Sequence, residues 1–145
     1  MTRMPLNESQ PILIVEDSDD DFEAVKRAFK AANLHNPIKH VYSGEEALRY
    51  LQSGPSPIPG IILLDLNMPG VDGRKTLEII KQHEELKHIP VVILTTSGDD
   101  RDIEACYRLG ANTFIQKPVD FDGLIAAIKR LKEYWFEFAL LPKDT

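Results

Sequence analysis

Acidic, hydroxyl and basic side chains recur in this sequence directly after short aliphatic runs. The pair Glu16 and Asp17 follows PILIV, and Asp65 follows IILL. Farther along, Thr95 follows PVVIL, and Lys117 follows TFIQ. Carboxylates that are brought together repel one another, so they favour a proton or a hard divalent cation. Oxygen ligands without histidine or cysteine favour Mg²⁺, with Mn²⁺ also suitable, and a carboxylate beside such an ion can attack phosphorus.

These side chains can meet only if the aliphatic runs are strands of one sheet. The runs at 11–15, 38–42, 61–65, 89–97 and 113–118 alternate with longer amphipathic segments. This alternation predicts an α/β fold of (βα)5 type, with a five-stranded parallel sheet and helices on both faces. Parallel strands end at the same edge of a sheet, and ligands bind in the crevice at that edge. The polar residues after the strands are therefore expected to converge there.

Local signals also mark the helices. Ser43 and Glu46 have the spacing of a capping box at the start of a helix. Gly110 is expected to end the fourth helix. The last helix is expected over 120–135, with one apolar side formed by Leu124, Ile128, Leu131 and Trp135.

Composition bounds the kind of protein. The chain has 145 residues, of which 43% are hydrophobic and 28% charged, as suits one domain with a proper core. We expect an N-terminal extension (1–10), a domain (11–131) and an apolar tail (132–145). The net charge of -6 disfavours DNA as a partner, because phosphate binding needs excess cation. No apolar run approaches the ~20 residues that span a membrane, and no secretory signal is evident, so a cytoplasmic location is expected.

Cysteine and histidine are expected to play no part in metal binding. Cys106 is the only cysteine, so no internal disulfide can form. The four histidines show no metal-ligand spacing and are expected at the surface: His35, His40, His83 and His88.

The acidic pair and the stretches LLDLNMPGVDG, ILTTS and QKPV together resemble the receiver domain of two-component response regulators. The resemblance covers about 11–131. It implies a flavodoxin-like fold in which Asp65 accepts a phosphoryl group from a sensor histidine kinase. It further implies that Asp17 and the backbone carbonyl of Asn67 bind Mg²⁺ together with Asp65, while Glu16 acts through water.

The same resemblance assigns the switch residues. Lys117 would pair with the phosphoryl group, and Thr95 would donate a hydrogen bond to it. Phe114 would be the aromatic residue that turns inward when Thr95 moves. From the residues alone, Phe114 is better interpreted as a core residue. An ion-pair network that only shapes the surface is the less favoured interpretation of the charged group.

Two other functions compete with phosphoryl acceptance. Phosphohydrolases of the haloacid-dehalogenase type need a second aspartate two residues after the nucleophile, and Asn67 stands there. An amide cannot exchange a proton at neutral pH, so the chain is not expected to be an enzyme. A phosphate-independent interaction module remains the alternative, although it would be expected to lack Asp65, Thr95 or Lys117.

The apolar stretch YWFEFALLP (134–142) allows two interpretations. Trp135 and Phe138 could fold back on the domain, or the stretch could pair two chains, which we favour. This tail, the opening VEDSDDD and the long loop before the third strand resemble cyanobacterial phytochrome-associated single-domain regulators. That resemblance implies a phytochrome as the kinase and a homodimer through the fourth and fifth helices and the strand between them.

Overall fold

Five strands form one parallel sheet in the order β2-β1-β3-β4-β5. The structure is a computed structural model that describes residues 9–66, 73–96 and 98–138. The order is that of the doubly wound flavodoxin-like fold, as predicted. The strands are β1 (Ile12–Val15), β2 (Ile38–Val41), β3 (Ile61–Leu64), β4 (Val91–Thr95) and β5 (Thr113–Gln116).

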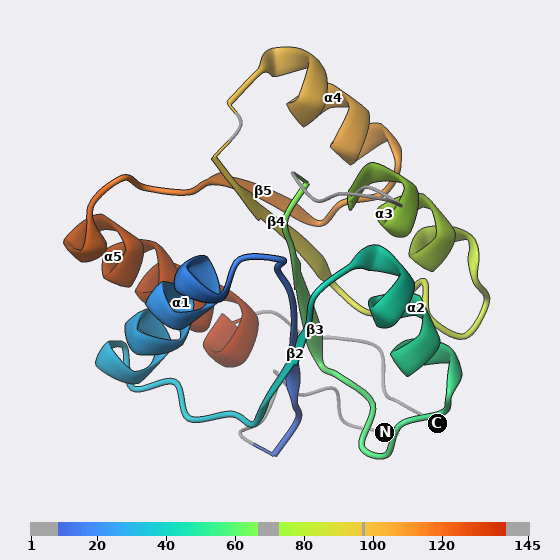
Figure 1. Cartoon of the computed structure of the whole chain (residues 1–145), viewed down its shortest axis with the longest axis horizontal. Helices are drawn as coiled ribbons and strands as arrows, with labels where there is room; N and C mark the ends of the chain where they lie inside the picture. Colours follow the sequence, from blue (N-terminus) through green and yellow to red (C-terminus); the bar gives the residue numbers. More distant parts are fainter. Residues whose placement is uncertain (1–8, 67–72, 97, 139–145) are drawn as a thin grey trace.

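Helices cover both faces of this sheet. Helices α1 and α5 lie on one face, and α2, α3 and α4 lie on the other (Figure 1). In the part of the chain that the structure describes, no helix is long and apolar enough to cross a bilayer. The helices are α1 (Asp19–Ala31), α2 (Gly44–Gln52), α3 (Gly73–Gln82), α4 (Asp100–Arg108), α5 (Phe121–Lys132) and the π-helical segment η1 (Glu133–Phe138).

The central strands β1, β3 and β4 are buried on both sides, and all of their residues are apolar except Thr95 at the end of β4. In β1, Leu13 and Val15 face the cluster under α2 to α4, whereas Ile12 and Ile14 face the cluster under α1 and α5. Strands β3 and β4 are buried along their whole length in the same way. The ladder pairs Val15 with Leu64, so the polar residues that follow β1 and β3 emerge at the same height.

The ends of the elements agree with the local signals. Ser43 Oγ accepts a hydrogen bond from the Glu46 amide at 3.1 Å. Gly110 has a φ of 108°, and the amide after it donates to the Cys106 carbonyl at 2.9 Å, which ends α4. Each observed strand is shorter than the run that predicts it, because prolines and the polar residues at the run ends leave the ladder.

Trp135 folds back on the domain. It lies on η1, which continues α5, and it is 7% exposed within the cluster that contains Ile128 and Leu131. The side of the last helix predicted from the sequence is therefore confirmed. Of the two interpretations of the tail, folding back holds for Trp135, whereas neighbouring Tyr134 is 56% exposed.

Replacement of Trp135 by alanine should lower the free energy of unfolding by about 3–5 kcal/mol, because a large buried side chain leaves a cavity. Tyr134→Ala, which removes an exposed ring, should cost no more than about 1 kcal/mol. Urea denaturation followed by circular dichroism measures both values. Equal and small losses would show that Trp135 does not contribute to the core.

Candidate functional site

Three carboxylates converge at the carboxyl ends of two adjacent central strands. Glu16 and Asp17 follow β1, and Asp65 follows β3. Each of the three offers an oxygen atom, and these atoms all lie within 4.8 Å of one another. The backbone fixes them, because the Glu16 amide donates to the Val41 carbonyl at 3.0 Å and the Asp65 amide donates to the Val15 carbonyl at 3.2 Å. The predicted convergence is thus confirmed for these three residues.

The three carboxylates differ in their exposure to water. Glu16 is 3% exposed and Asp65 is 8% exposed, whereas Asp17 is exposed. Burial, and then the charge of Asp65, raises the pKa of Glu16 to about 7, against the opposing effects of the Ser18 amide and Lys117. In the metal-free protein, the folded state therefore holds a proton on Glu16 that the unfolded chain releases near its ordinary pKa of 4.5. This proton makes stability fall as the pH rises from about 4.5 to about 7.

Lys117 supplies positive charge to the cluster. Its side chain is 11% exposed, and its Nζ lies 3.2 Å from Glu16 Oε1 and 4.0 Å from Asp21 Oδ2. Its amide donates to the Thr95 carbonyl at 2.6 Å, which aligns the end of β5 with the end of β4. The lysine thus reaches across the sheet edge to the carboxylate that follows β1.

The acidic triplet after the site belongs to the start of α1. Asp19, Asp20 and Asp21 occupy the first turn of that helix, where negative charge is favourable. None of the three belongs to the carboxylate group described above, although Asp21 lies near Lys117. Their interpretation as helix-terminal charges agrees with this placement.

The two switch positions lie on neighbouring strands. Thr95 ends β4 and is fully buried. Phe114 lies on β5 opposite Ile93, and its half-buried ring packs against the cluster under α2 to α4. Its amide donates to the hydroxyl of Tyr107 on α4 at 3.1 Å. Asn67, the remaining predicted ligand, lies outside the described residues.

A glycine allows α3 to begin close to the site. A Cβ atom at Gly73 would lie 2.5 Å from the carbonyl oxygen of Asp65 and 2.8 Å from Cα of Leu66. Real Cβ atoms are not found so close to backbone atoms, so α3 requires glycine at its first residue. This contact joins positions that are separated along the chain, so a local sequence pattern does not reveal it.

His40 is only partly exposed and makes contacts that the sequence did not indicate. Its ring is stacked on Phe22, and its Nε2 lies 2.8 Å from the carbonyl oxygen of Glu16. Its position in β2, directly opposite Ile14 of β1, was the available signal. That signal becomes visible only when the strand order is known.

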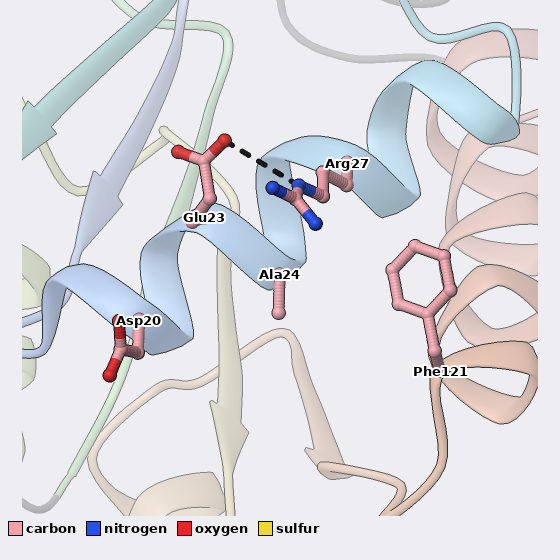
Figure 2. A pocket seen from close by; sticks show the side chains of 5 residues that line it. All are labelled: Asp20, Glu23, Ala24, Arg27 and Phe121. Atoms are coloured by element: carbon pink, nitrogen blue, oxygen red, sulfur yellow. Dashed lines mark ion pairs between the residues drawn. The ribbon is translucent and has the colours of Figure 1, made fainter.

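A shallow pocket lies beside the site, between α1 and the start of α5 (Figure 2). The ring of Phe121 faces α1 across it, and an ion pair of 3.7 Å joins Arg27 and Glu23 on α1. Next to this pocket Val119 is fully exposed and Phe121 is 45% exposed. The segment that follows Lys117 therefore presents apolar surface beside the carboxylates. The lining residues are Asp20, Glu23, Ala24, Arg27 and Phe121.

The donor atoms of the site suit a hard divalent cation. Glu16, Asp17 and Asp65 supply oxygen only, and oxygen ligands select Mg²⁺ or Mn²⁺ over zinc. Burial and the charge of Asp65 raise the pKa of Glu16 even with Lys117 nearby, and a cation would oppose both effects. The residues present therefore fit such an ion.

Comparison with known proteins gives one family. The response regulator receiver domain matches residues 12–129. Response regulator Rcp1 of Synechocystis sp. is 38% identical over 143 residues, which cover 94% of this chain and 97% of Rcp1.

Two solved structures have the same fold. The phosphorylated cyanobacterial phytochrome response regulator RcpA is 35% identical, with a TM-score of 0.86 over 93% of this chain and 99% of that one. The Mn²⁺-bound form of Rcp1 is 36% identical, with a TM-score of 0.82 over 92% and 99%. The predicted fold and the resemblance to cyanobacterial phytochrome regulators are confirmed, and this chain belongs to the response regulator receiver domain family.

Proposed function

We propose that this receiver domain accepts a phosphoryl group on Asp65 in a reaction that depends on Mg²⁺, with Mn²⁺ as a substitute. The observation that carries the proposal is the buried carboxylate of Asp65 in a cluster with Glu16 and Asp17, next to the ammonium group of Lys117. A carboxylate oxygen of Asp65 attacks phosphorus, the new O–P bond forms, and the bond from phosphorus to the donor breaks.

The other residues of the site have separate tasks in this proposal. Asp17, Asp65 and the carbonyl of Asn67 hold the ion, with Glu16 acting through water. The ion, when bound, offsets charge on the phosphoryl oxygens. Lys117 leaves Glu16 to pair with the phosphoryl group, and Thr95 donates a hydrogen bond to it. Phe114 follows Thr95 inward, which changes the surface that β5 and α4 present.

The proposed phosphodonor is a sensor histidine kinase of the phytochrome type in the cytosol. The similarity to Rcp1 and to RcpA, which is described as a phytochrome response regulator, supports this partner. The kinase must bring its phosphohistidine to the exposed side of the carboxylates. The apolar residues Val119 and Phe121, beside that side, are suited to contact it.

We also propose that the chain forms a homodimer and that its output is a contact between proteins rather than catalysis or DNA binding. An apolar groove beside the open edge of β5 supports the pairing. Its lining includes Ile115, Ala127, Leu131 and exposed Tyr134. The division into an N-terminal extension (1–10), a receiver domain (11–131) and a tail (132–145) that takes part in pairing belongs to this proposal, and residues 1–8 and 139–145 lie outside the described part of the chain.

The first test is the intact mass after incubation with acetyl phosphate and Mg²⁺. Wild type should gain one phosphoryl group, and Asp65→Asn, whose amide is a poor nucleophile, should gain none. Omission of Mg²⁺ should abolish the gain. Labelling of the variant at the wild-type level would refute the site, and no labelling of wild type by either acetyl phosphate or a phytochrome kinase would favour the phosphate-independent module.

A second test uses the pKa of Glu16. Because this carboxyl holds a proton below about pH 7, a divalent cation must displace the proton, and affinity for Mn²⁺ should fall about tenfold between about pH 8 and about pH 6. Glu16→Gln has no such proton and should show a shallower pH dependence. Calorimetric titration measures both curves. Equal slopes would show that another group accounts for the pH dependence.

A third test addresses pairing. Tyr134→Glu places charge at the rim of the groove and should give a monomer at concentrations where wild type sediments as a dimer. Lys129→Glu, a charge change at an exposed position of α5 that does not line the groove, is the matched control and should leave the dimer intact. A dimer that persists in Tyr134→Glu would place the interface elsewhere.

A further inference from the structure

The imidazole ring of His40 is fixed by aromatic neighbours at the open edge of the sheet. Its centroid lies 3.7 Å from that of Phe22 on α1, with the two planes nearly parallel at 11°. Just after β2, the ring of Tyr42 lies 4.2 Å away from the ring of His40. Contacts of this kind orient a ring beyond what burial alone would do. His40 therefore presents its distal nitrogen in one direction.

That nitrogen contacts the backbone of the site. His40 Nε2 lies 2.8 Å from the carbonyl oxygen of Glu16. A carbonyl oxygen only accepts hydrogen bonds, so Nε2 carries the hydrogen and donates it. The imidazole thus acts as a donor to the peptide group that joins Glu16 to Asp17.

This hydrogen bond stands where the regular ladder between β1 and β2 ends. The last paired residues are Val15 and Val41, and the Glu16 amide still donates to the Val41 carbonyl. The Glu16 carbonyl has no further strand residue of β2 paired with it in the ladder, and the His40 side chain donates to it instead. Both backbone groups of Glu16 are consequently attached to β2.

The residues after Glu16 are held at their far end as well. The Ser18 amide donates to Glu16 Oε2 at 3.1 Å, and the hydroxyl of Tyr42 donates to Asp19 Oδ1 at 2.6 Å. Asp17 lies between these attachments, with its own side chain exposed. Its direction is therefore set by the peptide group that His40 binds.

We propose that His40 is a positioning residue that orients the peptide between Glu16 and Asp17 for binding of a divalent cation. This inference rests on the proposed function, because it assigns His40 to the same cation site. The aromatic stack serves stability, and the Nε2 hydrogen bond serves cation affinity. Residues that orient metal ligands commonly contribute about 10–100-fold to affinity.

Two variants separate these contributions. His40→Phe keeps an aromatic ring against Phe22 but removes the donor, whereas His40→Gln keeps an N–H at similar reach but removes the ring. Calorimetric titration with Mn²⁺ at about pH 8, together with thermal unfolding of the metal-free protein, gives both readouts. His88→Leu, at an exposed histidine between α3 and β4, is the control.

His40→Phe should bind Mn²⁺ about tenfold more weakly with little change in melting temperature. His40→Gln should melt at a lower temperature yet keep affinity within about threefold of wild type. Equal losses of affinity in the two variants, or no loss in His40→Phe, would overturn the role of the hydrogen bond. If wild type binds no Mn²⁺, the proposed function itself fails, and the role of His40 fails with it.

Discussion

Repulsion among three carboxylates at one edge of the sheet is the constraint on which the site depends. Glu16, Asp17 and Asp65 offer oxygens within 4.8 Å of one another, and two of these residues are buried. Such a group is unfavourable by itself, because burial and like charge both oppose ionisation. The fold tolerates it because the burial of every residue of β1 and β3 stabilises these strands whatever the charge at their ends. Burial and the charge of Asp65 together raise the pKa of Glu16.

Lys117 balances only part of this negative charge, so the charge of the site depends on what else binds there. Its Nζ approaches Glu16 and Asp21, which lie on the β1 and α1 side of the cluster. A proton on Glu16, the divalent cation of the proposed function and this ammonium group would therefore compete to neutralise the same carboxylates. In a simple buried ion pair, one positive charge balances one negative charge. Here three carboxylates face one ammonium group, so a further positive group would be favourable.

Sequence reasoning succeeded where a residue follows a buried strand and failed where contacts cross between elements. The aliphatic runs predict β1, β3 and β4, and parallel pairing then places Glu16, Asp17 and Asp65 together. The contact of His40 with the Glu16 carbonyl depends on the register of β2 against β1 and on the direction of a side chain, and neither is encoded in a local pattern. The direction of Trp135 was similarly ambiguous, because an apolar helical stripe can face its own domain or a second chain. Asn67 lies outside the described residues, so its assignment stays a prediction.

The two edge strands differ from the central ones in a way that bears on signalling. Strands β2 and β5 are only partly buried, so packing stabilises them less than it stabilises β1, β3 and β4. Hydrogen bonds that involve side chains add to their stability. At β2 the ring of His40 donates to the Glu16 carbonyl, and at β5 the hydroxyl of Tyr107 accepts from the Phe114 amide. Single hydrogen bonds of this kind are worth only about 1 kcal/mol, far less than the burial of a strand. In the proposed function, a change of charge at the carboxylates, which lie between these edges, would therefore act on the edge strands more readily than on the centre of the sheet.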